Sequence, residues 1–305
     1  MSNKTQRNVA ARQSDALISP VPIFFVFLWS TGFIVAKFGL PFAPPLTFLI
    51  LRCAAVLLVL APLVWILKAP WPKGQIGHIA ISGLLLQAGY LGGVWCAIKL
   101  GMPAGVTALI VGMQPILTAA AAPLIGESVR PWQWLGLFLG LTGVALVVYA
   151  KITMVGVTPL AIGYCLFALL SITAGTMYQR RYCPQFDLRT GTVIQFAATV
   201  AVLLPFAVVF EQFSPALRTV QWTPSFIGAL LWSVFALSIG AIFLLFTLLR
   251  RSDATAVTSL MYLTPPTTAV MAWLMFGEVF SLLGVIGMAV AIAGVVCVVK
   301  NQEKS

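Results

Sequence analysis

The chain has 305 residues, of which 60% are apolar and 8% are charged, and its formal net charge at pH 7 is +11. Soluble domains carry about 25% charged residues, so a chain this poor in charge cannot cover a water-facing surface. The composition excludes a soluble domain and predicts a polytopic helical membrane protein in a lipid bilayer. The basic residues fall between apolar runs, where they set orientation, so we expect no nucleic-acid partner.

After a basic tail (1–19), the chain contains ten apolar segments. They span residues 21–40, 46–67, 77–98, 103–125, 132–150, 157–177, 190–210, 224–248, 254–276 and 279–299, and 301–305 follow as a C-terminal tail. Each is near the roughly 20 residues that a helix needs to cross about 30 Å of hydrocarbon. Barrel strands would be shorter and would alternate apolar with polar residues. The segments therefore predict ten transmembrane helices.

The positive charges predict the orientation of these helices. Ten crossings place both termini on one side, and thirteen Lys and Arg residues fall on that side. Only Lys37, Lys99, Lys151 and Arg218 fall on the other side, while Arg52 lies within a segment. Because cytoplasmic loops carry the excess of Lys and Arg, we expect both termini to be cytoplasmic.

The chain also contains an internal repeat. Residues 101–148 align without a gap with 252–299 at an offset of 151, with twelve of 48 positions identical. The identical pairs include Pro115 with Pro266, Gly126 with Gly277, Glu127 with Glu278, Gly136 with Gly287 and Gly143 with Gly294. The first two segments match the sixth and seventh at an offset of 143, which places Arg52 opposite Gln195.

The repeat predicts two units of five helices, 20–151 and 152–300. Since five is an odd number, the two units must insert with opposite orientations. Inverted repeats are a common design of secondary transporters, whose substrate site lies near mid-membrane at the repeat interface.

Several sequence stretches resemble a known family. LWSTGFIVAK (28–37), PPLTFLILR (44–52), GVTALIVGMQPILTA (105–119) and GESVRPWQWLGLFLGLTGVALVV (126–148) resemble the EamA family of the drug/metabolite transporter superfamily. The resemblance covers about residues 21–300. It implies a basket of helices one, three, four, six, eight and nine around a central cavity, with helices five and ten as outer scaffold. It also implies export of amino acids, other metabolites or toxic compounds. The stretch 168–181 departs from the pattern, because it lacks a tryptophan matching Trp29.

Polar and aromatic residues within the segments are candidates for substrate binding, because their polar groups need partners, water or a ligand there. They are Trp29, Ser30, Lys37, Gln87, Tyr90, Trp95, Gln114, Thr118, Tyr164, Ser171, Thr173, Tyr178, Trp232, Ser238, Tyr262 and Thr264. The alternative for aromatic residues near segment ends is an anchor at the membrane interface.

Hinge and gate residues are predicted from the repeat. Pro115 and Pro266, the latter preceded by Pro265, are expected in mid-helix, as hinges beside the cavity or as static kinks. Glu127 and Glu278 end the fourth and ninth helices at opposite membrane faces, as helix caps or as gate residues. We expect Arg52 to contact Glu278, since a basic residue within a span needs a partner. Glu127 would pair with Gln195 or Arg189.

Gly136 and Gly140 form a GxxxG pattern on the fifth helix, which Gly287 and Ala291 repeat on the tenth. Small residues at this spacing allow close helix packing, either within the bundle or at a dimer seam. We therefore expect a monomer, or a homodimer through helices five and ten.

Groups for other chemistry are sparse in this sequence. The five cysteines have no CxxC spacing, and His78 has no cysteine or carboxylate cluster near it, so we expect no metal site and no cofactor. The seven carboxylates avoid the segment centres, which argues against coupling through a central acid. No GxxxxGK[ST] nucleotide loop occurs, so ATP would not drive transport.

Together these features predict a secondary active or facilitative transporter that works by alternating access in a bacterial inner membrane. The family resemblance implies that it exports a small organic metabolite, such as an amino acid or a related amphipathic solute. The alternatives are a channel, a non-transporting scaffold or a membrane-embedded enzyme.

Overall fold

The computed structural model describes residues 20–121, 131–155, 157–214, 216–241, 244 and 263–300. Within these ranges every regular element is a helix, which confirms the predicted all-helical class. The first half contains α2 (Pro20–Gly39), α3 (Pro45–Ile66), α4 (Ile76–Gly83), η1 (Leu84–Gly89), α5 (Tyr90–Lys99), α6 (Ala104–Val111), α7 (Gln114–Ala121) and α8 (Pro131–Val155). The second half contains α9 (Pro159–Tyr182), α10 (Leu188–Glu211), α11 (Pro224–Leu231), η3 (Trp232–Gly240), α14 (Thr264–Phe276) and α15 (Leu282–Lys300).

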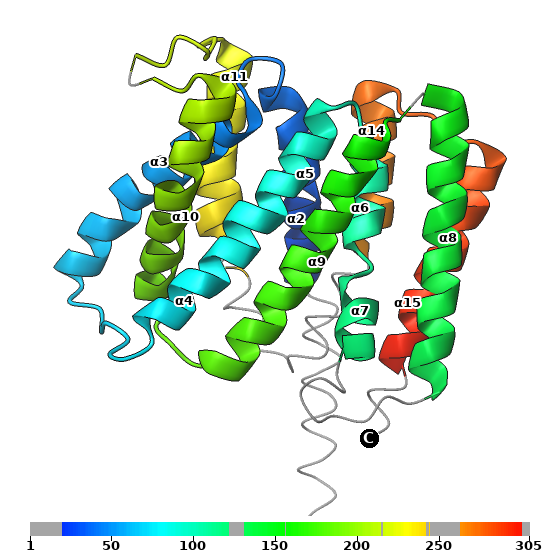
Figure 1. The fold of residues 1–305 in the computed structure, drawn as a ribbon, viewed down its shortest axis with the longest axis horizontal. Coiled ribbons are helices and arrows are strands. Elements are labelled where there is room, and N and C mark those ends of the chain that lie inside the picture. Colours follow the sequence, from blue (N-terminus) through cyan, green and yellow to red (C-terminus); the bar gives the residue numbers. More distant parts are fainter. Residues whose placement is uncertain are drawn as a thin grey trace, which may run out of the picture.

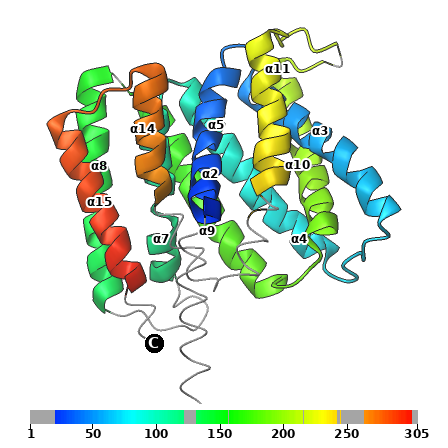
Figure 2. The ribbon, with the colours of Figure 1, turned by 180° about the vertical axis from the view of Figure 1, so that it is seen from behind.

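The helices run between two faces of a bundle (Figure 1). We call the face formed by residues 40–44, 216–223 and 277–281 the upper face, and the face formed by 67–75 and 183–187 the lower face. Figures 1 and 2 show α2 running from the lower to the upper face, whereas α9 runs from the upper to the lower. The first helices of the two halves thus point in opposite directions.

Four helical stretches are long and apolar enough to cross a membrane: Pro45–Ile66, Ile76–Lys99, Pro159–Tyr182 and Leu188–Glu211. Shorter apolar helices cover Ile23–Gly39, Ala104–Thr118, Trp134–Ala150, Pro224–Gly240 and Leu282–Gly294. Each of the ten predicted segments contains at least one described helix, and the number of crossings stays a prediction.

Two carboxylates of the second half cap helices of the first half at the upper face. The helices α3 and α6 follow prolines that offer no side-chain acceptor to the first free N–H groups. Glu211 instead accepts from the N–H groups of Leu46 and Thr47 at 2.8 and 2.7 Å. Glu278 accepts from the N–H groups of Ala104 and Gly105 at 3.0 and 3.4 Å. Each carboxylate also complements the positive end of the helix dipole.

Glycines hold α8 and α15 together at one edge of the bundle (Figure 2). A Cβ on Gly287 would lie 2.7 Å from the carbonyl oxygen of Gly143, and one on Gly294 would lie 2.6 Å from the amide nitrogen of Gly140. The predicted small-residue pattern therefore packs these two helices against each other within one chain. A homodimer through them stays a prediction.

The fourth apolar segment is broken rather than continuous. Helix α6 ends at Val111, and α7 begins at Gln114, so that Pro115 lies in the first turn of α7. The expected mid-helix position of Pro115 is therefore wrong. A proline in the first turn removes no helical hydrogen bond, because that N–H group has no partner within the helix.

The prolines of the ninth segment have the same placement. Pro265 and Pro266 lie in the first turn of α14, which corrects the expected mid-helix position of Pro266 as well. The break between α6 and α7 lies beside the start of α14, since a Cβ on Gly112 would lie 2.7 Å from Cγ of Pro265.

Candidate functional site

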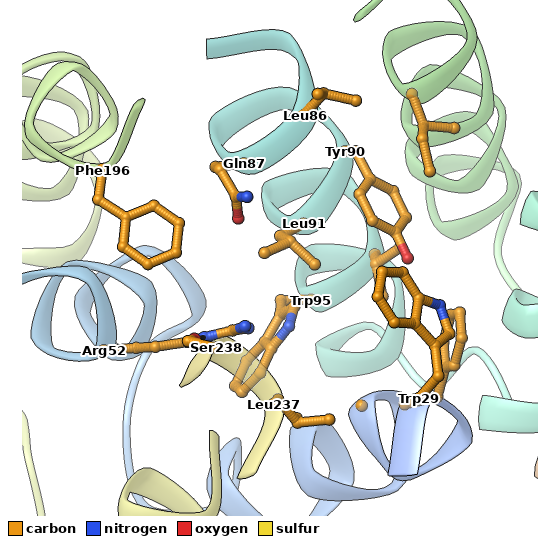
Figure 3. A pocket seen from close by; sticks show the side chains of 14 residues that line it. Trp29, Arg52, Leu86, Gln87, Tyr90, Leu91, Trp95, Phe196, Leu237 and Ser238 are labelled. Atoms are coloured by element: carbon orange, nitrogen blue, oxygen red, sulfur yellow. Dashed lines mark hydrogen bonds between the residues drawn. The ribbon is translucent and has the colours of Figure 1, made fainter. Parts of the chain in front are cut away.

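A cavity of about 230 Å³ lies between helices of both halves. Its lining consists of Trp29, Gly32, Phe33, Arg52, Leu86, Gln87, Tyr90, Leu91, Val94, Trp95, Ile172, Phe196, Leu237 and Ser238 (Figure 3). A single buried water needs only roughly 10–15 Å³ of such space, so the cavity has room for a small organic solute.

Aromatic side chains form much of the wall, and core packing holds them in place. Trp95 is 1% exposed, and its ring centroid lies 4.3 Å from that of Phe48. Trp29 packs against Phe25 with a centroid distance of 5.6 Å. Such rigid rings provide flat apolar contact surfaces for a solute.

Arg52 brings a positive charge into this cavity. It lies about two turns after the start of α3 at Pro45, and it is buried. Its Nε–H donates to Oγ of Ser238 at 3.0 Å, and the Ser238 hydroxyl donates to the carbonyl of Ser233 at 2.9 Å. Arg52 takes part in neither of the ion pairs Lys37–Glu278 and Arg189–Asp187.

Two π-helical stretches supply further polar groups. Leu86 and Gln87 come from η1, and Leu237 and Ser238 come from η3. Figure 3 shows the Gln87 amide pointing into the cavity. Gln87 and Ser238 lie 151 residues apart, which is the offset that aligns 101–148 with 252–299. Such widened turns are rare and frequently occur at functional sites.

The structure brings some of the predicted site residues into the lining and leaves others outside. Those in the lining are Trp29, Gln87, Tyr90, Trp95 and Ser238, together with Arg52. Those outside are Ser30, Lys37, Gln114, Thr118, Tyr164, Ser171, Thr173, Tyr178, Trp232 and Thr264. Glu127 and Tyr262 lie outside the described residues.

Many of the residues outside the lining bind other protein groups. The Gln114 amide donates to Oγ1 of Thr176 at 2.9 Å, and the Trp232 indole N–H donates to Oγ1 of Thr31 at 2.9 Å. The Ser171 hydroxyl donates to a backbone carbonyl of η1 at 2.8 Å. These side chains join helices to one another, which satisfies their polar groups without a ligand.

The predicted contact of Arg52 with Glu278 is wrong. Oε1 of Glu278 instead lies 2.7 Å from Nζ of Lys37, which also lies 4.4 Å from the ring centroid of Phe276. Glu278 follows α14 at the upper face, where the end of α2 brings Lys37 to it, whereas Arg52 lines the cavity. We call Lys37, Glu278 and the N–H groups of Ala104 and Gly105 the Glu278 cluster.

The two partners predicted for Glu127 have other contacts at the lower face. Gln195 donates to the Ser82 hydroxyl at 3.1 Å. Arg189 pairs with Asp187 at 2.7 Å, and Asp187 also accepts from the Arg189 backbone N–H at the start of α10. These hydrogen bonds from Arg189 hold the pKa of Asp187 below its ordinary value.

The sequence did not reveal the apolar part of the lining. Gly32, Phe33, Leu86, Leu91, Val94, Ile172, Phe196 and Leu237 are of the same types that face lipid elsewhere. The described lining differs in part from the basket of helices that the family resemblance implies. The lining includes Arg52 of the second helix and Phe196 of the seventh, and it includes no described residue of the fourth or ninth.

Apolar helices around a cavity whose described wall carries one charge and several aromatic rings are features of a membrane-embedded transporter. Residues 21–149 and 159–300 match the EamA-like transporter family, and the chain belongs to this family.

Relatives that are named as transporters or efflux pumps match the chain over most of their length. The chain is 29% identical over 294 residues to "Uncharacterized transporter YvbV" of Bacillus subtilis, covering 92% of this chain and 91% of that protein. It is 25% identical to a "Probable amino-acid metabolite efflux pump" of Salmonella typhimurium, over 89% of this chain and 91% of that protein. It is 26% identical to "Uncharacterized inner membrane transporter YedA" of Escherichia coli K12, over 89% and 87%.

A solved crystal structure shares the fold. It superposes with a TM-score of 0.62 at 20% identity and covers 96% of this chain and 99% of the other. At this identity the likeness concerns the fold alone.

Proposed function

We propose that this chain is an alternating-access secondary transporter with ten membrane crossings in two inverted halves, 20–151 and 152–300. It exports a small organic metabolite, such as an amino acid or a related amphipathic solute. The observation that carries the proposal is the cavity, which lies between the two halves and combines aromatic walls with a few polar groups.

Three features support the inverted arrangement. The helices α2 and α9 run in opposite directions between the faces. Gln87 and Ser238, which lie 151 residues apart, both line the cavity. The prolines of the two halves lie in the first turns of α7 and α14.

The excess of Lys and Arg supports termini in the cytoplasm, which makes the lower face cytoplasmic. The name of the YedA relative supports an inner membrane.

Counterflow in proteoliposomes tests this function. Vesicles that contain the purified full chain and a high internal concentration of one unlabelled solute are expected to accumulate the same labelled solute transiently. A panel of amino acids and common metabolites should contain at least one solute with saturable uptake. Uptake that never saturates would indicate a channel, and a folded protein without flux for the whole panel would contradict transport.

Blocking the cavity provides a matched pair of variants. A Cβ on Gly32 would have only the Leu237 side chain within 4 Å, at 3.9 Å, so Gly32→Phe places its ring in the cavity. A Cβ on the exposed Gly163 would meet nothing within 4 Å, which makes Gly163→Phe the control. We expect Gly32→Phe to abolish counterflow and Gly163→Phe to retain it, with similar elution of both proteins in size-exclusion chromatography.

The break before Pro115 and the start of α14 at Pro265 are proposed hinges, and we call both of them breaks. Gly112→Ala adds a methyl group 2.7 Å from Cγ of Pro265, so it should restrict motion between the two breaks. We expect a several-fold lower maximal flux with an unchanged half-saturating concentration. Gly228→Ala on α11, where a Cβ meets nothing within 4 Å, is the control. Equal maximal flux in both variants would leave the breaks as static kinks.

A further inference from the structure

The described residues of the cavity wall carry one positive charge and no negative charge. Among the lining residues that the structure describes, Arg52 is the one charged side chain, and none is a carboxylate. Tyr90, Gln87 and Ser238 add neutral polar groups, and the remaining lining residues are apolar or aromatic. The described part of the wall therefore presents a net positive charge to whatever occupies the cavity.

The guanidinium of Arg52 donates to the protein through Nε, and its two Nη groups face the cavity. Its Nε–H donates to Ser238, and this is the hydrogen bond that the structure gives to the Arg52 side chain among the described residues. The two Nη groups remain as donors toward the cavity, where Figure 3 shows the end of the side chain. A buried cation without a carboxylate partner is costly, and a ligand carboxylate could accept from both Nη groups at once.

We propose that the cavity selects a small organic anion with a net charge of −1, whose carboxylate binds Arg52. The apolar body of the solute lies between Trp29 and Trp95. This substrate class rests on the proposed transport function, and it narrows that function from amphipathic metabolites in general to monocarboxylates.

The same wall disfavours a zwitterion or a cation of equal size. An ammonium group in the cavity would share it with Arg52 and would find no carboxylate among the lining residues. Buried charges need paired partners, so the added ammonium lowers affinity. An amino acid should therefore bind more weakly than the carboxylic acid with the same carbon skeleton, and an amine should bind most weakly.

The competing role for Arg52 is structural, because its bond to Ser238 joins α3 to η3. A structural arginine would affect the stability of the protein without changing its preference for the charge of the solute. The charge preference is therefore the readout that separates the two roles.

A matched set of ligands tests the proposal on the purified full chain at neutral pH. The set consists of 3-phenylpropanoate, L-phenylalanine and 3-phenylpropan-1-amine, with 3-methylbutanoate, L-valine and 3-methylbutan-1-amine as a smaller series. Binding is measured by the shift of the melting temperature with ligand concentration. In at least one series we expect the carboxylate to bind at least about tenfold more tightly than the amine, with the amino acid between them.

Variants of Arg52 then test whether this residue causes the preference for the carboxylate over the amine. We expect Arg52→Gln to weaken carboxylate binding at least about tenfold and to remove the preference over the amine. Arg52→Lys should retain part of the preference, because a lysine keeps the charge and loses the bidentate geometry. Arg218→Gln removes one positive charge from the loop at the upper face, outside the cavity lining, and should leave binding unchanged.

Three results would overturn the proposal. These are equal or tighter binding of the amines in wild type, no saturable binding of either carboxylate, and an unchanged preference in folded Arg52→Gln. If Arg52→Gln does not fold, the wild-type series and Arg52→Lys decide the question.

Binding and flux are measured separately. A carboxylate that binds through Arg52 but shows no counterflow contradicts the transport function alone. Counterflow of amines without carboxylate binding contradicts the anion selectivity alone.

Discussion

Replacing Gly143 by alanine is expected to lower the melting temperature of the purified protein clearly, whereas the same replacement at Gly163 is not. The added Cβ of Gly143→Ala would collide with the backbone of Ala291 on α15, which cannot move without separating the two helices. Overpacking of this kind costs about 1–3 kcal/mol of unfolding free energy.

The control variant, Gly163→Ala, should not lower the melting temperature. Gly163 is exposed on α9, and a Cβ there meets nothing within 4 Å. Alanine forms helix more readily than glycine by up to about 1 kcal/mol, so Gly163→Ala should leave the melting temperature unchanged or raise it. Equal melting temperatures for the two variants in the same detergent would contradict the close contact of α8 with α15.

Removing the carboxylate of Glu278 should have the second large effect. Glu278→Ala leaves Lys37 without its partner and two N–H groups of α6 without an acceptor. We expect a loss of about 2 kcal/mol or more of unfolding free energy, measured by melting in detergent. The side chain of Lys37 is 34% exposed, so solvent screens part of the ion pair.

Glu278→Gln separates the two contributions of this residue. The amide oxygen of glutamine can still accept from the N–H groups of Ala104 or Gly105, but it carries no charge for Lys37. Glu278→Gln should therefore lose less unfolding free energy than Glu278→Ala. Arg189→Gln breaks the exposed ion pair at the lower face and should change stability little. If Glu278→Ala melts like Arg189→Gln, the Glu278 cluster does not stabilise the fold.

The all-helical class could be predicted from the sequence, because the apolar runs have the length of a membrane crossing and the charges lie between them. Part of the site could also be predicted. Trp29, Gln87, Tyr90 and Trp95 are polar or aromatic groups inside apolar runs, and such groups face protein or a cavity more readily than lipid.

The rest of the site depends on helix rotation and on contacts between distant segments. Gln114 and Trp232 are also polar or aromatic groups within apolar runs, yet their helices turn them toward Thr176 and Thr31. Phe196 lines the cavity, but its side chain is of a type that equally faces lipid. No periodicity distinguishes these cases in helices that are apolar on every side.

The partner of Glu278 could not be predicted for a different reason. Arg52 and Lys37 are both basic residues of the first two helices, and the sequence offers both to this carboxylate. Glu278 pairs with Lys37 because the end of α2, where Lys37 lies, reaches the loop after α14.

The caps at the upper face set an order for biosynthesis. The first turns of α3 and α6 receive their acceptors from Glu211 and Glu278, which the ribosome adds more than a hundred residues after those turns. A nascent chain that ends before residue 211 therefore holds both helices with unsatisfied N–H groups. The first turn of α6 receives its acceptor only when the chain has been synthesised as far as Glu278, just before α15.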